Sequence, residues 1–276
     1  MLTNSSSGDA DGVGSLITLR LNNTYGTNIA FYATIDTNKT VITIDPTNNL
    51  PQSQGVYVAI GSTLEDYADN SITAANATFT TTMDPSLEAF YPFNGNANDL
   101  TSNGRNLAVY ADTTLTTGKD NSSNSAYSFD GNGDYLETAN IPSFDNYTIS
   151  LWAKPASSGT YEAMFSSYDN PSYGFQIDLN SSNRFHIRKS SGGNIVMSKA
   201  QLGVWTFIAF TYDGSNSKGY INGRLDNSSS GGTTQFNRFR IGRNRHGGTY
   251  FKGAIDELRI YKRALTASEI SSLYGN

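Results

Sequence analysis

Apolar or β-branched residues occupy every second position in short runs along most of the chain. This alternation is typical of strands that bury one face. The first series comprises LITLRL (16–21), NIAFYATID (28–36), KTVITID (39–45), GVYVAIG (55–61) and NATFTTT (76–82). Turns rich in Asn, Asp and Thr separate these runs. We therefore predict a small β-sandwich over residues 15–82, after a flexible N-terminal segment, residues 1–14, that offers little to bury.

A second, longer series follows residues 83–86, a short linker in which Pro85 keeps the preceding residue extended. It comprises EAFYPF (88–93), NLAVYA (106–111), YTISLWAKP (147–155), EAMFSSY (162–168), GFQIDL (174–179), RFHIRK (184–189), WTFIAFTYD (205–213), KGYING (218–223), FRIGR (239–243) and GAIDELRIYKR (253–263). Ten or more strands favour a two-sheet jelly roll over residues 87–276. The predicted fold class is all-β.

One helix is predicted, at the tail of the chain. Thr266 and Glu269 have the spacing of a capping box, and apolar Ile270, Leu273 and Tyr274 follow at helical spacing.

Composition narrows the function classes. The 276 residues contain no cysteine, which excludes a disulfide scaffold, a Cys-ligated zinc site and a thiol nucleophile. No apolar run approaches the roughly 18 residues needed to cross a bilayer, so membrane insertion is not expected. The pI near 5.0 and the abundance of Asn, Thr, Ser and Gly favour a secreted or surface-exposed bacterial protein.

The first series of strands resembles a bacterial Ig-like domain of the kind repeated in surface proteins. The phrases TIDTNKTVITIDPTNNL and VYVAIGSTLEDYADNSITAANATFTT carry the resemblance. Two strands that usually open such a domain have no counterpart here. An incomplete Ig-like sheet exposes an edge, and self-assembly by strand donation between subunits is one expected use of it.

The second series resembles the laminin-G-like family of concanavalin A-like lectin and glucanase jelly rolls. The resemblance rests on YPFNGNANDLTSNGRNL, SFDGNGDYLE, YTISLWAKP, WTFIAFTYDG, KGYING and FKGAIDELRIYKRALTASEISSLY, in the order of the family. It implies binding of carbohydrate or protein outside the cell, without naming a ligand.

The loop that begins at Asn94 could bind calcium, because it offers several of the oxygen ligands this ion needs. The resemblance implies a structural calcium between this loop and the acidic residue of the late strand, here Asp256. We expect Asp99 and Asp256 as side-chain ligands, with Asn94 and Asn96 or nearby carbonyls completing the shell. The alternative is an Asx-turn loop without metal. The segment 130–134 is better explained as a hairpin turn.

Basic residues are concentrated late in the chain. Residues 184–276 hold 14 of the 19 basic and 5 of the 24 acidic residues. Alternation places His186 and Arg188 on one strand face, so that adjacent strands could form a basic strip for sulfate or carboxylate groups. The alternative is a solvent face paired with acids from elsewhere in the domain.

Two predicted loops, residues 168–173 and 243–250, supply the aromatic and planar polar groups of a sugar site. In contrast, Trp152 and Trp205 fall in apolar alternating strands and are expected in the core. The candidate ligand-binding residues are Tyr168, Tyr173, His186, Arg188, Arg243, Arg245, His246 and Tyr250.

Catalysis is not expected. The paired glutamates of glucanases on this fold are missing, as are the short motifs of serine, zinc and phosphate chemistry. Our first hypothesis is a calcium-stabilised, extracellular carbohydrate-binding or adhesion module that prefers anionic glycans and binds no nucleic acid. The alternative is a structural or protein-binding module of a surface filament, an S-layer-like coat or a phage fibre.

Overall fold

The computed structural model describes residues 2–4, 17–35, 41–47, 50, 54–62, 73–138, 141–157, 159, 161–167, 174–189, 193–231 and 238–275. The chain divides into two compact units, with the boundary between Asp84 and Pro85. Within the described residues, no helix combines the length and apolar character needed to span a bilayer.

The first unit contains two three-stranded antiparallel sheets. One has the order β1-β3-β4 and the other β2-β5-β6. Their bounds are β1 Leu2–Asn4, β2 Ile17–Leu21, β3 Phe31–Ile35, β4 Ile42–Pro46, β5 Gly55–Ile60 and β6 Ala75–Thr80. Among the described residues of this unit, the buried core cluster comprises Ile17, Leu19, Phe31, Ala33 and Val56. The Ig-like assignment of this unit stays a prediction.

One strand of this unit was not expected from the sequence. Residues 2–4 fall in the segment predicted to be flexible, yet they form β1, which pairs with β3 from Leu2 opposite Ala33 to Asn4 opposite Phe31. Leu2 and Thr3 are too few to show an alternating pattern, so the sequence carries no signal for this strand. Most of the predicted flexible segment lies outside the described residues.

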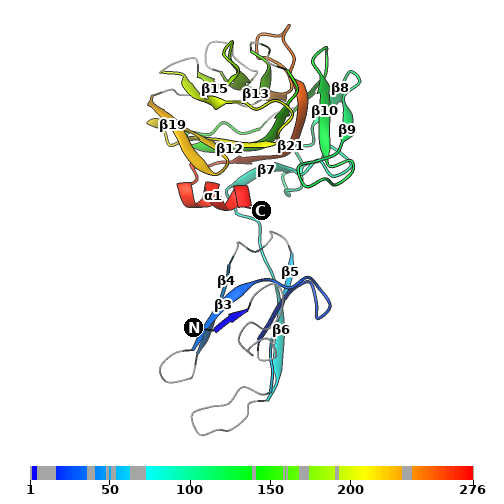
Figure 1. Cartoon of the computed structure of the whole chain (residues 1–276), viewed down its shortest axis with the longest axis vertical. Helices are drawn as coiled ribbons and strands as arrows, with labels where there is room; N and C mark the ends of the chain where they lie inside the picture. Colours follow the sequence, from blue (N-terminus) through cyan, green and yellow to red (C-terminus); the bar gives the residue numbers. More distant parts are fainter. Residues whose placement is uncertain are drawn as a thin grey trace. The chain divides into compact units, whose positions relative to one another are not determined.

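The second unit is a two-layer jelly roll, as predicted (Figure 1). The eight-stranded sheet has the order β19-β18-β17-β12-β21-β10-β9, with β7 also paired to β21. Its bounds are β7 Leu87–Tyr91, β9 Thr114–Thr116, β10 Ala126–Asp130, β12 Tyr147–Pro155, β17 Thr206–Tyr212, β18 Asn216–Ile221, β19 Arg224–Ser230 and β21 Lys252–Tyr261.

The seven-stranded sheet has the order β16-β15-β14-β13-β20-β11-β8. Its bounds are β8 Ala108–Tyr110, β11 Tyr135–Glu137, β13 Ala163–Ser167, β14 Phe175–Leu179, β15 Arg184–Lys189, β16 Ile195–Lys199 and β20 Phe239–Ile241. The inward side chains of both sheets form one core cluster, in which aromatic rings such as Phe165, Phe175 and Phe210 pack against one another.

Helix α1, Ala267–Gly275, packs against the outer face of the eight-stranded sheet (Figure 1). Tyr274 stacks on Trp152 with ring centroids 5.6 Å apart, and Ile270 is fully buried. Trp152 thus lies on the helix side of its strand. Both Trp152 and Trp205 are half-buried, whereas the sequence predicted them in the core.

Candidate functional site

The outer face of the seven-stranded sheet carries a group of buried polar side chains on β14 and β15. Because Phe175 and Ile177 face the core, the alternating residues Gln176 and Asp178 face outward. The antiparallel register places Gln176 opposite Arg188 and Asp178 opposite His186. Two neighbouring strands thereby bring four polar side chains together.

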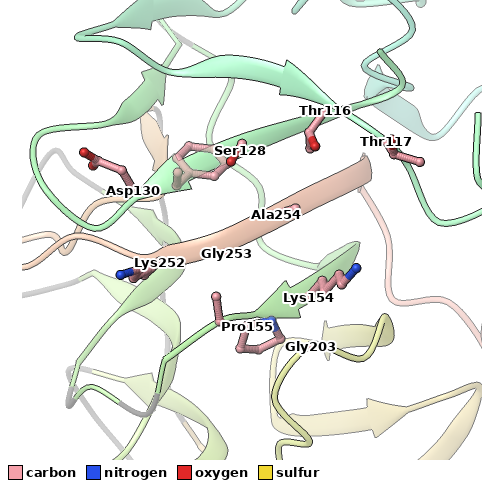
Figure 2. A pocket seen from close by; sticks show the side chains of 12 residues that line it. Thr116, Thr117, Ser128, Asp130, Lys154, Pro155, Gly203, Lys252, Gly253 and Ala254 are labelled. Atoms are coloured by element: carbon pink, nitrogen blue, oxygen red, sulfur yellow. The ribbon is translucent and has the colours of Figure 1, made fainter. Parts of the chain in front are cut away.

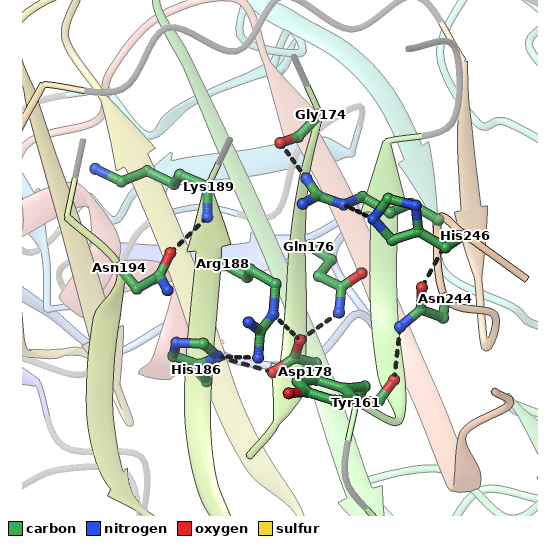
Figure 3. Close-up of polar contacts among 11 residues, drawn as sticks. Tyr161, Gly174, Gln176, Asp178, His186, Arg188, Lys189, Asn194, Asn244 and His246 are labelled. Carbon is green, nitrogen blue, oxygen red and sulfur yellow. Dashed lines mark hydrogen bonds and ion pairs between the residues drawn. The ribbon is translucent and has the colours of Figure 1, made fainter. Parts of the chain in front are cut away.

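Asp178 is the centre of this group, and its carboxylate is fully buried. Its Oδ1 lies 3.1 Å from Nδ1 of His186, and its Oδ2 accepts a hydrogen bond from Nε of Arg188 at 3.3 Å (Figure 3). The side-chain amide of Gln176 donates to the same Oδ2. A buried carboxylate needs such partners, so Asp178 holds three neighbouring side chains in fixed positions.

Arg188 also stacks on an aromatic ring. Its guanidinium carbon lies 4.3 Å from the ring centroid of Tyr161. Tyr161 has a φ of 64°, a left-handed conformation that is unusual for a bulky residue. Two hydrogen bonds to the backbone of Tyr161 stabilise this conformation. Tyr161 N donates to Leu179 O at 2.8 Å, and Tyr161 O accepts from the side-chain Nδ2 of Asn244 at 3.2 Å.

Asn244 begins a tight loop that forms the next wall of the site. The loop closes through Asn244 N donating to Thr249 O at 2.9 Å. Arg245 donates from Nε to Nε2 of His246 at 3.2 Å and from Nη1 to the carbonyl of Gly174 (Figure 3). Burial, and then the nearby charge of Arg188, lower the pKa of Arg245. Arg245 is thus a partly desolvated cation beside a second arginine.

Together these groups surround a pocket of about 380 Å³, which we call the sheet-face pocket. Its lining residues are Tyr161, Gln176, Arg188, Asn244, Arg245, His246, Gly247 and Thr249. Among the described residues, Oε1 of Gln176 is buried and has no hydrogen-bond partner. The pocket therefore combines an unpaired buried acceptor, arginine donors and an aromatic face, which are the groups that fix a polar ligand with ring-shaped apolar faces.

The structure brings three of the predicted ligand-binding residues together in this pocket, namely Arg188, Arg245 and His246. His186 is 5% exposed and contacts Asp178 beneath the pocket. Arg243 and Tyr250 pair at the base of the loop, where the guanidinium carbon lies 5.5 Å from the ring centroid. Tyr168 and Tyr173 lie outside the described residues.

Sequence reasoning missed Tyr161, Gln176 and Asp178, and it included Asn244 only as a member of the predicted loop 243–250. The strand run GFQIDL did contain a signal, since Gln176 and Asp178 occupy its polar positions. What the sequence does not show is that this strand pairs with RFHIRK in the register that aligns Asp178 with His186.

The predicted metal residues have different surroundings. Asp99 is 9% exposed, and each carboxylate oxygen accepts two hydrogen bonds. The donors are Phe90 N, Thr101 N, Thr101 Oγ1 and Arg105 N, at 2.8–3.0 Å. These four bonds use the lone pairs of the carboxylate, so Asp99 stabilises its own loop, and its role as a calcium ligand stays a prediction.

The carboxylate of Asp256 has more capacity than that of Asp99 to coordinate a metal ion. It is 3% exposed, and its Oδ2 accepts one bond from Lys119 N at 2.9 Å. Burial raises the pKa of Asp256 to about 6. Asn96 Oδ1 accepts from Asn98 N at 2.9 Å in an Asx turn, and Asn94 is exposed. In the described part of the chain, no three His, Cys, Asp or Glu side chains lie together as a cluster.

A larger hollow, of about 550 Å³, lies on the outer face of the eight-stranded sheet (Figure 2). Gly253 and Ala254 form its floor, and Lys154, Lys252 and Asp130 flank it. These three charged side chains are exposed. Because no buried unpaired polar atom of the described residues lines this hollow, it has the character of an ordinary solvent-facing sheet surface.

Residues 130–271 match the model of one family, the concanavalin A-like lectin/glucanases superfamily. The chain belongs to this superfamily. The match covers every residue of the sheet-face pocket. A comparison with curated protein sequences finds no significant match.

Among solved structures, one similar protein is domain 4 of AbnA, a GH43 extracellular arabinanase from Geobacillus stearothermophilus, in complex with arabinotriose. Its sequence identity is 26% and its TM-score 0.57, over 68% of this chain and 98% of that domain. The receptor-binding domain of botulinum neurotoxin C/D mosaic serotype shares the fold at 15% identity and a TM-score of 0.57, over 70% of this chain and 52% of that one. The binding domain of Paraclostridial Mosquitocidal Protein 1 does so at 18% identity and a TM-score of 0.54, over 68% and 52%.

Proposed function

We propose that this protein is a non-catalytic glycan-binding module that acts outside the cell, and that it binds its ligand in the sheet-face pocket with a preference for anionic sugars. The observation that carries the proposal is the buried Oε1 of Gln176, which has no partner among the described residues. A buried acceptor of this kind is costly unless a ligand supplies a donor, and a sugar hydroxyl is a suitable one.

The rest of the pocket fits the same class of ligand. The ring of Tyr161 supplies an apolar face for sugar C–H groups, with the guanidinium of Arg188 stacked on it. Arg188 and Arg245 give the pocket two cations, of which only Arg188 contacts the carboxylate of Asp178 among the described residues. This excess of positive charge supports a preference for carboxylate or sulfate groups.

The AbnA domain adds support from comparison. It is named as part of an extracellular enzyme and as bound to arabinotriose, and this chain covers nearly all of it. A module that binds the polysaccharide while another part of a protein does the chemistry agrees with the lack of a paired-glutamate motif in this sequence.

Calorimetric titration tests the proposal with three sugars, namely arabinotriose, trigalacturonate and methyl-esterified trigalacturonate. We expect measurable binding, with the free acid preferred over its uncharged ester. Arg245→Ala and Gln176→Ala should each weaken binding by about tenfold or more, because each removes a partner of a desolvated ligand group.

Arg224→Ala is the matched control, since Arg224 is an exposed arginine on β19 of the other sheet. No binding of any sugar on a broad glycan array by the wild-type protein would overturn the proposal. Hydrolysis of arabinan or pectin by the purified protein would contradict the non-catalytic part alone.

We also propose a structural calcium ion, and the residues present fit it in part. The carboxylate of Asp256 is buried and is hydrogen-bonded by the backbone N–H groups of Lys119 and Glu257, which leaves part of its lone-pair capacity for a cation. Lys119 N of the loop 117–125 bonds this carboxylate, and Asn124 O of the same loop accepts a hydrogen bond from Gly95 N, the residue after Asn94. Asp256, this loop and Asn94 would hold the ion, whereas Asp99 is saturated by its own loop.

One observation favours the second candidate function, assembly through the first unit. All six residues of the edge strand β6 are exposed, including Phe79, which pairs with the fully buried Val56. An exposed edge strand can pair with another chain. Light scattering over a range of concentrations tests this, and a dimer that Phe79→Lys abolishes would support it.

A further inference from the structure

A second group of side chains on the outer face of the seven-stranded sheet forms a continuous stack of rings and a guanidinium. The rings of Tyr110 and Tyr135 are parallel within 3°, with centroids 4.4 Å apart. The guanidinium carbon of Arg243 lies 4.9 Å from the centroid of Tyr135 and 5.5 Å from that of Tyr250. We call these four residues the aromatic–arginine stack.

The stack is open to ligand at its edge. Tyr110 lies on the edge strand β8 and is 40% exposed. One face of the Tyr110 ring packs on Tyr135, which holds Tyr110 in one orientation. Less conformational entropy is therefore lost when a sugar ring packs on the exposed part of Tyr110.

Arg243 has unused hydrogen-bonding capacity. Its guanidinium has no ion pair or hydrogen bond to any of the described residues, and its Nε is buried without a partner. The acid beside the stack, Glu137, is already bound by Arg240 at 2.6 Å and by Arg238 at 3.3 Å. Arg243 is therefore a cation whose planar N–H donors find no acceptor among the described residues, a suitable partner for a carboxylate or sulfate group.

The stack adjoins the sheet-face pocket. Both depend on the loop between β20 and β21, because Arg243 and Tyr250 pair at its base while residues 244–247 and Thr249 line the pocket. Gly247 lies between the sheet-face pocket and the aromatic–arginine stack. It lines the pocket, and a Cβ atom placed there would lie 3.3 Å from Nη2 of Arg243.

We propose that the aromatic–arginine stack is a second saccharide subsite, which takes an acidic residue of the same glycan chain that occupies the sheet-face pocket. The subsite rests on the proposed function and defines its substrate class as an acidic oligosaccharide. The pocket binds one sugar, and the stack binds a later one through Tyr110 and Arg243.

The test is the dependence of affinity on chain length, measured with galacturonate oligomers of one to five residues. In the wild-type protein the affinity should rise by about tenfold or more once the oligomer reaches the stack. Tyr110→Ala should abolish this rise and leave the affinity for monogalacturonate unchanged. Arg243→Gln should also abolish the rise, and its affinity for monogalacturonate is measured alongside, because Arg243 pairs with Tyr250 at the base of the loop that lines the pocket. Arg224→Gln and Tyr25→Ala are the matched controls, since Tyr25 is 93% exposed in the other unit.

The outcomes separate this inference from the function on which it rests. If the rise with length persists in both variants while Arg245→Ala still loses binding, the subsite is wrong and the pocket stands. If Arg243→Gln lowers the melting temperature but leaves every affinity unchanged, the stack is only structural, which also overturns the inference. If the wild-type protein binds arabinotriose but no galacturonate oligomer, the pocket stands and the acidic substrate class falls.

Discussion

At the scale of single residues, the organisation of the pocket depends on Asp178. This carboxylate is fully buried and contacts His186, Arg188 and Gln176. Asp178→Asn keeps the shape but removes the charge that Arg188 faces. We expect a loss of about 2 kcal/mol in the free energy of unfolding, measured with urea, because the side chains around Asp178 lose hydrogen bonds to a charged acceptor, while Arg188 keeps partial contact with solvent.

The same variant should also weaken glycan binding, since Arg188 would no longer be held over Tyr161. Asp112→Asn is a suitable control, because Asp112 is an exposed acid of the same domain. Unfolding curves of Asp178→Asn and Asp112→Asn that coincide would show that the buried network contributes little.

Asp256 supports a separate prediction, on metal binding. Calcium should raise the melting temperature of the wild-type protein and a chelator should lower it, because an ion that binds only the folded state stabilises that state. Asp256→Asn should abolish this response, whereas Asp130→Asn, at the exposed hairpin turn, should retain it. A wild-type melting temperature that is the same in calcium and in chelator would exclude the site.

Residue by residue, the sequence predicted side-chain direction better than partners. Alternation alone placed His186 and Arg188 on one face of a strand, and the structure agrees. Strand order and register cannot be deduced from alternation, so Asp178 on the neighbouring strand was missed. The same limit applies to Asp99, because a loop rich in oxygen donors has the same sequence whether it binds an ion or its own backbone N–H groups.

At the scale of elements, helix α1 is the segment where local sequence rules sufficed. Glu269 Oε2 accepts hydrogen bonds from Thr266 N at 2.7 Å and from Thr266 Oγ1 at 2.9 Å, and Thr266 Oγ1 accepts from Glu269 N at 3.3 Å. This confirms the predicted capping box. Arg263 adds two charge-assisted bonds to the same carboxylate, at 2.7 and 2.9 Å.

This arrangement predicts a pH-dependent stability. The bonds from Arg263, followed by those from Thr266, lower the pKa of Glu269 from 4.5 to about 2. A lowered folded-state pKa means that the stabilisation is complete above about 4.5 and is lost as the pH falls toward 2.

Glu269→Gln should therefore cost about 1 kcal/mol of unfolding free energy at pH 7. The gap between variant and wild type should narrow between pH 4.5 and pH 2, as urea unfolding at several pH values would show. Ser268→Ala, at an exposed neighbouring position, is the control. A gap that stays constant down to pH 2 would contradict the role of the charge.

Strands were predicted where a buried face leaves a pattern and missed where it does not. Strand β12 was predicted with its observed bounds, because its apolar positions alternate over nine residues. Strand β19 was missed, since its sequence RLDNSSS is polar and almost wholly exposed. Its hydrogen bonds to β18 hold it in the sheet, and backbone pairing at an edge needs no apolar side chains.

At the scale of the whole molecule, the two units differ greatly in core size. Among the described residues, the core cluster of the jelly roll contains 33 buried residues, whereas that of the first unit contains five. Burial of apolar surface is the main favourable term in folding, so stability should follow these cores. The sequence predicted this division from the linker 83–86 and from the change in the length of the strand series.

The last prediction follows from that difference. A fragment of residues 85–276 should fold alone and melt at nearly the temperature of the main transition of the full chain, because its core and the sheet-face pocket lie wholly within it. A fragment of residues 1–84 should melt lower and less cooperatively, since the core that its described residues form offsets little chain entropy. Calorimetry of the full chain and both fragments measures this, with sugar titration of the longer fragment alongside. A longer fragment that unfolds or loses sugar binding would show that the first unit contributes to the jelly roll, and the pocket could then no longer be treated as the property of one domain.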